Sequence, residues 1–210
     1  MIKSLKIKIL LSFSLLILML AVAGIMSILE FRNMGHSVDK VLKNNYESIE
    51  SAKLMLDAAE REDSGVLMWM IGDTESGQQT IQASDSIIRE AIVKTQKNIT
   101  EQNEEEYISK IIDAYEKYHA SVQKILQNKT ALPESKKIYD SETQTHFFNT
   151  KKAINDLMVL NQDEMYKQSS IVKEKSKRAM MPAIVSIVAA VIFAILLNFF
   201  ITIYFINPLK

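Results

Sequence analysis

Two long stretches without a charged residue frame this chain of 210 residues. Residues 9–29 form the first stretch, of 21 residues, and residues 179–206 form the second, of 28 residues. An α-helix rises about 1.5 Å per residue, and the hydrocarbon core of a bilayer is about 30 Å thick. Each stretch is therefore long enough to cross a membrane as a helix. We expect a membrane protein with two spans.

The first stretch also resembles a secretory signal peptide. Lysines at positions 3, 6 and 8 precede its apolar core, and the small residues Ala21, Val22 and Ala23 are typical of a cleavage site. The apolar residues nevertheless continue to Leu29, which a signal peptide does not need. Whether this segment is cleaved or retained, the residues after it are sent across the membrane.

The distribution of basic residues bears on the orientation of the chain. The three lysines in residues 1–8 favour a cytoplasmic N-terminus by the positive-inside rule, whereas the four basic residues in 173–178 favour the inverted topology. The first span usually dominates, and long loops translocate largely regardless of their charge. We therefore predict that residues 30–178 are extracytoplasmic.

Residues 30–178 have a mildly acidic and soluble-looking composition. They hold 21 basic and all 25 acidic residues of the chain, and the whole chain has no cysteine, five glycines and three prolines. No net basic face with interleaved aromatic residues is found, so a nucleic-acid partner is not indicated.

Apolar residues recur at three- and four-residue steps through this middle segment, which predicts helices and no strands. In the first helix, Tyr46, Ala52 and Met70 are placed on the buried face, and turn-forming residues at 72–77 end it. The four helices predicted from this pattern cover residues 30–71, 75–100, 104–129 and 134–178. The fold class is therefore all-α: an antiparallel up-down four-helix bundle whose outer helices are continuous with two transmembrane helices.

The helix lengths suggest a dimer. At about 1.5 Å per residue the two outer helices reach roughly 63 and 68 Å, and the two inner helices only roughly 39 Å. The inner pair covers only the membrane-distal part of the outer pair, and two helices alone make a poor core. A parallel homodimer would complete a membrane-proximal four-helix arrangement.

Four short sequence motifs and the layout of the chain resemble a known family. The motifs are Asn45-Tyr46-Glu47-Ser48-Ile49, Arg61-Glu62-Asp63-Ser64, Gly72-Asp73, and Pro208-Leu209 two residues past the second stretch. They are similar to the receptor half of bacterial HAMP-containing sensor histidine kinases with four-helix periplasmic domains. The layout resembles that family over nearly the whole chain, and the residues do so only in these motifs. Four-helix chemoreceptors resemble it too.

The resemblance implies a domain order and a function. Residues 1–8 would be cytoplasmic, 9–29 and 179–206 would cross the bacterial inner membrane, and 207–210 would begin a HAMP linker, although Asn207 replaces the basic residue often found there. The chain would sense an external small molecule or protein and pass a helix displacement to a kinase that follows Lys210. The alternatives are the sensor half of a methyl-accepting chemoreceptor and a membrane-anchored helical scaffold without a ligand.

No chemistry is indicated within these 210 residues. The sequence has no glycine-rich phosphate loop, no cluster with metal-ligand spacing and no nucleophile with a base, so we predict no catalytic residue, metal or cofactor. His36, His119 and His146 are interpreted as structural or solvated.

Asp63 breaks the apolar line of the first predicted helix. An unpaired charge there would cost several kcal/mol if fully buried, so the carboxyl group must be paired, protonated or exposed. With Arg61 and Ser64 it forms a candidate ligand-binding cluster, and the alternative is a rim of polar residues facing water. Three further residues are candidates for signalling: Pro182 and Asn198 in the second span, and Pro208 at the start of the linker.

Overall fold

The computed structural model describes residues 2–127, 132–201 and 203. The described part of the chain contains helices and turns and no strand, so the prediction of an all-α fold is confirmed. The elements are α1 (Ile2–Met70), α2 (Thr74–Lys97), α3 (Glu104–Gln127), α4 (Leu132–Ile138), the π-helix η1 (Tyr139–Thr143) and α5 (Gln144–Ile201). The chain divides into two compact units: the first comprises Met1–Asp39 and Gln168–Lys210, and the second comprises Lys40–Lys167.

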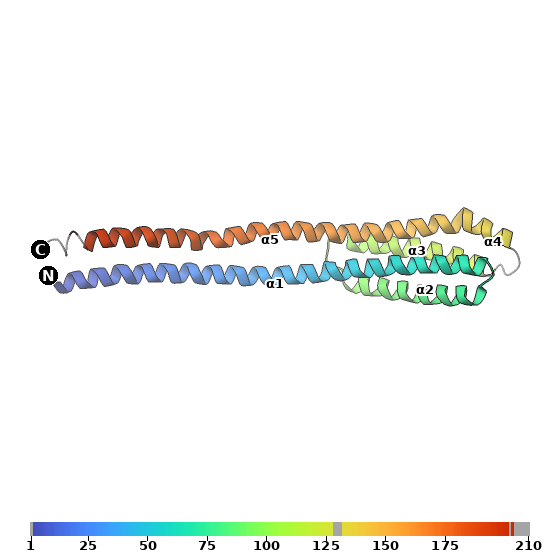
Figure 1. Ribbon diagram of the computed structural model, residues 1–210, viewed down its shortest axis with the longest axis horizontal. Coiled ribbons are helices and arrows are strands. Elements are labelled where there is room, and N and C mark those ends of the chain that lie inside the picture. Colours follow the sequence, from blue (N-terminus) through green and yellow to red (C-terminus); the bar gives the residue numbers. More distant parts are fainter. Residues whose placement is uncertain (1, 128–131, 202, 204–210) are drawn as a thin grey trace. The chain divides into compact units, whose positions relative to one another are not determined.

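The second unit is an up-down four-helix bundle. Its helices are the C-terminal part of α1, then α2, α3, and the succession of α4, η1 and the N-terminal part of α5 (Figure 1). The observed ends of α2 and α3 lie within three residues of the predicted ones. The predicted turn at 128–133 falls mostly outside the described residues.

The turn between α1 and α2 explains why both helices end where they do. Gly72 has a φ of +104°, a left-handed conformation that favours glycine at the end of a helix. Asp73 follows as the N-cap of α2, where its side chain accepts a hydrogen bond from the backbone N–H of Ser76 at 3.3 Å. Glycine followed by aspartate therefore stops one helix and starts the next.

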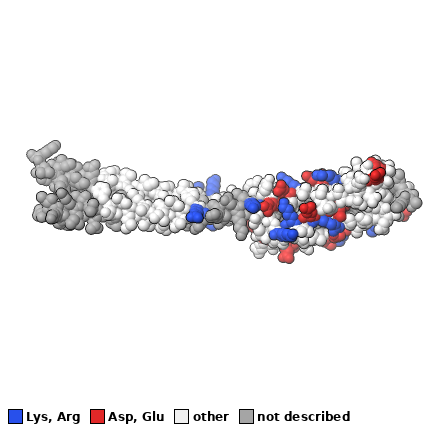
Figure 2. All heavy atoms as spheres, turned by 90° about the horizontal axis from the view of Figure 1, so that it is seen from below, with Lys and Arg blue, Asp and Glu red and all other residues white. Residues whose placement is uncertain are grey.

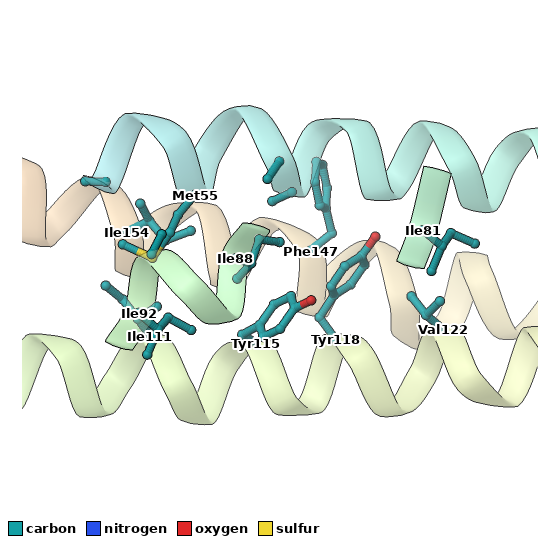
Figure 3. Close-up of a cluster of buried hydrophobic side chains, with 14 of the residues drawn as sticks. Met55, Ile81, Ile88, Ile92, Ile111, Tyr115, Tyr118, Val122, Phe147 and Ile154 are labelled. Carbon is teal, nitrogen blue, oxygen red and sulfur yellow. The ribbon is translucent and has the colours of Figure 1, made fainter. Parts of the chain in front are cut away.

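The core of the bundle contains side chains from all four helices, which point toward one another in Figure 3. Tyr115 and Tyr118 of α3 are fully buried, and their ring centroids lie 6.2 Å apart. The buried apolar set also includes Met55 of α1, Ile88 of α2 and Ile154 of α5. The helical periodicity of the sequence predicted this packing because apolar residues three and four positions apart share one helix face.

One residue of the predicted buried face lies elsewhere. Tyr46 is 60% exposed, so its placement in the core is wrong. At this level α1 buries Asn45 and Ser48 instead. Both are polar, and their side chains bond to groups in and around the connection between α2 and α3. An argument that counts only apolar residues misses such a face.

Glycines allow α1 and α2 to approach closely. A Cβ atom added to Gly77 would lie 2.7 Å from the carbonyl oxygen of Gly65 and 2.7 Å from the backbone nitrogen of Trp69. These neighbours are backbone atoms, which cannot rotate away. The crossing of the two helices therefore requires a residue without a side chain at position 77.

The first unit contains the apolar segments. Among the described residues, one continuous helical stretch, Pro133–Leu196, which includes most of α4, η1 and most of α5, is long and apolar enough to cross a membrane, and only 6% of its most apolar 18-residue segment is buried. In α1, Ile17–Leu29 is a shorter apolar stretch. Figure 2 shows white atoms over the apolar segments, whereas basic and acidic side chains are mixed over the bundle.

The two helices of the first unit touch through a hydrogen bond. The hydroxyl of Ser27 donates to the carbonyl of Ala179 at 3.3 Å. Pro182, three residues further on, has no N–H, and its ring disturbs the hydrogen bonds of the preceding turn. The missing N–H removes the helical donor to the carbonyl of residue 178, so the bond from Ser27 to Ala179 is an additional contact between the two helices.

Candidate functional site

Two consecutive carboxyl groups of α1 are buried in the bundle. Glu62 is fully buried and Asp63 is 9% exposed. Neighbouring residues of a helix point in directions about 100° apart, so the two side chains face different partners. Glu62 faces α2 and α3, and Asp63 faces η1.

Glu62 belongs to a polar group that we call the Glu62 cluster: Glu62, Asp85, Arg89, Tyr115 and His119. The Tyr115 hydroxyl oxygen lies 2.9 Å from Glu62 Oε2 and 2.7 Å from Asp85 Oδ1. His119 Nδ1 lies 3.8 Å from Glu62 Oε1 and 3.5 Å from Asp85 Oδ1. Arg89 Nε donates to Asp85 Oδ1 at 2.8 Å. The cluster joins three helices through hydrogen bonds and charges.

Burial alters the protonation of this cluster. Desolvation raises the pKa of Glu62, although the nearby His119 ring and the Tyr115 hydroxyl oppose the shift. The pKa of His119 is also raised, chiefly by its interaction with Glu62 and less by Asp85. Desolvation raises the pKa of Tyr115 as well, so this phenol stays protonated at any physiological pH. The cluster therefore retains protons that the same groups would lose in water.

Among the described residues, Asp63 has one hydrogen-bonding partner, a neutral hydroxyl group. The Tyr139 hydroxyl lies 3.2 Å from Asp63 Oδ1 and 3.1 Å from Oδ2. Desolvation raises the pKa of Asp63, and the Tyr139 hydrogen bond and the charge of Lys151 oppose that shift. The sequence required that Asp63 be paired, protonated or exposed, and the structure pairs it with a hydroxyl group.

The residue that pairs with Asp63 lies in an irregular segment. Tyr139 is the first residue of η1, a π-helical segment between α4 and α5. A single π-turn in an α-helix is rare and often occurs at functional sites. The sequence predicted an uninterrupted helix from residue 134 onward, because neither proline nor glycine marks the irregular segment.

The structure does not gather the three residues of the predicted ligand cluster around one point. Arg61 and Ser64 are exposed, and the Ser64 hydroxyl donates to the carbonyl of Glu60 in its own helix at 2.9 Å. Asp63 is turned inward to Tyr139. The exposed pair and the buried carboxyl group occupy different faces of α1.

A third buried carboxyl group lies at the other end of the bundle. Glu104 is fully buried, and its Oε1 accepts hydrogen bonds from Ser48 at 3.0 Å and from Asn161 at 3.1 Å. Its Oε2 accepts from the backbone N–H groups of Thr100 and Glu101 at 2.9 and 3.2 Å. This Glu104 cluster ties α1, α5 and the connection before α3 together. The sequence analysis assigned Glu104 only to the first turn of a helix.

The predicted signalling residues lie in the first unit or outside the described part. Pro182 lies inside α5, and its carbonyl accepts a hydrogen bond from Ser186 at 2.8 Å. The side chain of Asn198 and the whole of Pro208 fall outside the described residues.

Neither a metal centre nor a cofactor site is evident. Among residues 2–127, 132–201 and 203, no group of three or more histidine, aspartate or glutamate side chains is arranged to hold a metal ion. The buried polar clusters connect helices and hold protons. They can respond to a change in helix packing or in protonation.

The fold and these clusters define a class of protein: a helical bundle with buried polar groups, joined in one chain to an apolar helix that can cross a membrane. Residues 3–178 match the family described as "four helix bundle sensory module for signal transduction". The chain belongs to this family. No curated protein and no solved structure matches it significantly.

The two carboxyl groups that the sequence analysis overlooked are Glu62 and Glu104. Both carry a formal charge, and an expectation based on average behaviour places charged residues on the surface. A signal was present for Glu62, because it lies four residues before Val66, a position on the same helix face. For Glu104, the backbone N–H groups of Thr100 and Glu101 are local partners three and four residues earlier, whereas Ser48 and Asn161 lie 56 and 57 residues away and are brought to it only by the fold.

Proposed function

We propose that this chain is the extracytoplasmic sensing and membrane-anchoring part of a bacterial transmembrane signalling protein. The observation that carries the proposal is the family match over residues 3–178, a length that includes the bundle and the helix before it. The long apolar part of α5, whose most apolar 18-residue segment is only 6% buried, supports attachment to a membrane. In this proposal residues 9–29 and 179–206 are the two spans, and residues 30–178 lie outside the cell membrane.

The mechanism we propose is a small displacement of α1 against the last helix of the bundle. A stimulus can shift such a packing only if it binds one of two arrangements more strongly than the other. Helices connected to membrane spans transmit a slide or rotation because an α-helix is stiff along its axis. We expect the second span and the linker after it to transmit that motion toward the cytoplasm, and we expect Pro182, Asn198 and Pro208 to take part in this step.

The test uses the full-length receptor and a crosslink between α1 and α5. Lys151 Nζ and Glu60 Oε1 form an ion pair between these helices, so both positions are replaced by cysteine and joined with a bis-maleimide. The chain contains no other cysteine. We expect the crosslinked receptor to give a constant cytoplasmic output that no longer changes when the stimulus is added.

A matched control for that crosslink lies within one helix. Glu106 and Lys110 of α3 form an exposed ion pair four residues apart, and a crosslink there leaves α1 and α5 free to move. If both crosslinks leave output unchanged, the chain is a membrane-anchored scaffold and the proposed mechanism is wrong.

Two outputs are compatible with a sensory module of this kind. A methyl-accepting chemoreceptor fits the family match at least as well as the sensor histidine kinase that the short motifs resemble. Transfer of labelled methyl groups to glutamate side chains of the full-length protein would identify the first output. Transfer of labelled phosphate from ATP to a histidine would identify the second.

We also propose that the chain acts as a parallel homodimer in the membrane. Large apolar side chains of the bundle remain exposed on both outer helices: Leu54 and Met68 on α1, and Phe148 and Val159 on α5. A second copy would cover such side chains. Light scattering of the detergent-solubilised chain is expected to give twice the protomer mass, and a monomeric mass at every concentration would contradict the dimer.

Arg61 and Ser64 remain our proposal for contacts with a polar external stimulus. Both are exposed on α1, where a ligand or a partner protein can reach them. Replacing Arg61 with alanine should weaken the response of the full-length receptor to its stimulus without changing the helix content. Lys53→Ala, which removes another exposed positive charge from the same helix, is a matched control.

A further inference from the structure

The Tyr115 hydroxyl makes two contacts that one proton cannot satisfy. Its oxygen lies 2.9 Å from Glu62 Oε2 and 2.7 Å from Asp85 Oδ1, and both carboxyl oxygens can only accept hydrogen bonds when they are ionised. A phenol has one proton and can donate to one acceptor. The other contact would then place a lone pair of the phenol against a carboxylate. A second proton is therefore needed, and it must belong to one of the two carboxyl groups.

The surroundings of the two carboxyl groups show which one holds this proton. Asp85 is partly exposed, and its Oδ1 accepts a charged hydrogen bond from Arg89 at 2.8 Å. Glu62 is fully buried, and its Oε1 has no hydrogen-bonding partner among the described residues; the nearest cationic group, His119 Nδ1, lies 3.8 Å away, beyond hydrogen-bonding distance. Burying an ionised carboxylate without such compensation costs much more than burying a neutral acid. Protonated Glu62 therefore donates a hydrogen bond to the Tyr115 hydroxyl oxygen, and the Tyr115 hydroxyl donates to Asp85.

We propose that Glu62, Tyr115 and Asp85 form a proton-binding site inside the bundle, with the bound proton on Glu62, and that external protons are a second input to this sensor. The proton-binding step does not depend on the proposed signalling output. It can be measured on the chain alone.

Every element packed around Glu62 contributes to the charge of the site. Helix α2 supplies Asp85 and Arg89. Helix α3 supplies Tyr115, the buried phenol of Tyr118, His119, and Glu116, which accepts a hydrogen bond from Arg89 at 2.7 Å. On the side of the last helix, Tyr139 and Lys151 act on the neighbouring Asp63 instead. Glu62 therefore has one cationic neighbour of variable charge, His119, and one anionic neighbour, Asp85.

Removal of the proton changes the contacts between three helices. Two carboxylates would then compete for the single hydroxyl proton of Tyr115, and one of two contacts shorter than 3 Å becomes repulsive. Loss of a proton from His119 at rising pH acts in the same direction, because it removes the nearby positive charge. We expect α1 to move away from α2 and α3 at this level when the medium becomes alkaline.

Infrared spectroscopy of the full chain in lipid nanodiscs tests the site directly. A neutral carboxylic acid and a carboxylate absorb at different frequencies. We expect a carboxylic acid band at neutral pH that is lost as the pH is raised, and we expect Glu62→Gln to remove it. Glu50→Gln, at an exposed position of the same helix, should leave the band in place.

Three outcomes would overturn the proposal. No band at neutral pH means that both carboxyl groups are ionised and that His119 holds the proton. A band that survives in Glu62→Gln but is lost in Asp85→Asn shows that the proton is on Asp85 and not on Glu62. A band that no titration removes shows a fixed structural acid instead of a binding site for external protons.

A distance measurement connects the proton to helix movement and is independent of stability. Spin labels are attached at Asp57→Cys of α1 and Lys117→Cys of α3, both exposed positions in a chain without native cysteine. We expect the distance distribution to shift to larger values on alkalinisation in the otherwise native chain. In the Glu62→Gln background, which mimics the neutral acid, the distribution should not change. A shift of equal size in both backgrounds would exclude Glu62 as its cause.

Discussion

At the scale of single residues, the bundle is held by buried polar groups whose partners come from other helices. Glu62, Asp63 and Glu104 are all at most 9% exposed, and each is bound by hydroxyl, amide or backbone groups instead of a lysine or an arginine. A buried hydrogen bond of this kind contributes modestly while it is present and costs more when one partner is removed. Variants that remove one partner are therefore the sharpest tests.

Replacement of Tyr139 by phenylalanine is expected to destabilise the bundle by about 1 to 3 kcal/mol, because Asp63 loses its hydroxyl partner while it remains buried. Urea unfolding of the full chain in detergent, followed by circular dichroism, measures this loss. Tyr166→Phe is the matched control, since Tyr166 is 77% exposed and should be close to neutral. Equal effects of the two variants would contradict the assignment.

Replacement of Glu104 by alanine is expected to cost about 3 kcal/mol, because it leaves four donors without their shared acceptor. The variant Glu105→Ala changes an exposed neighbour and should have a small effect. The same unfolding experiment distinguishes them. Similar midpoints for both variants would show that the Glu104 cluster does not hold the bundle together.

At the scale of the elements, close helix packing and one irregular segment distinguish this bundle from a regular one. The crossing of α1 and α2 depends on Gly65 and Gly77, where two backbones meet. The last helix contains η1, which places Tyr139 opposite Asp63. Both features concern backbone geometry, which apolar periodicity does not describe.

We expect Gly77→Ala to destabilise the bundle by about 1 to 3 kcal/mol, because the new methyl group would lie 2.7 Å from backbone atoms that cannot move aside. Helix propensity alone predicts the opposite, since alanine stabilises helices relative to glycine by about 1 kcal/mol. The sign of the change in melting temperature therefore shows which of the two effects is larger. Gly24→Ala, with no atom within 4 Å, is the control that should be neutral or stabilising.

At the scale of the whole molecule, the buried acids make stability depend on pH. The pKa values of Glu62 and His119 are raised from their ordinary values of 4.5 and 6.5, so the folded chain binds more protons than the unfolded chain above those values. The free energy of unfolding must then decrease as the pH rises. The favourable contribution is complete at low pH and is lost as the pH passes the raised values.

The full chain is accordingly expected to melt at a lower temperature near pH 9 than near pH 6. Glu62→Gln should reduce this difference in melting temperature, because the glutamine side chain is neutral at both pH values. The pKa values of Glu106 and Glu142 are lowered by lysine partners, but both residues are exposed and act only at acidic pH. A melting temperature that increases between pH 6 and pH 9 would contradict the assignment of buried protons.

The sequence by itself determined the helices, their order and the apolar segments, because each depends on local information. Periodicity locates a buried face, glycine followed by aspartate marks a helix end, and a long stretch without charge marks a helix suited to lipid. The predicted ends of α2 and α3 were correct to within a few residues for this reason.

Only the tertiary structure decided which polar residues are buried and what they bind. Glu62 meets Tyr115 across 53 residues and Asp63 meets Tyr139 across 76, and neither pair can be identified from residues near them in the sequence. The direction of a side chain depends on how two helices are rotated about their axes. That rotation is set by the packing of all four helices together.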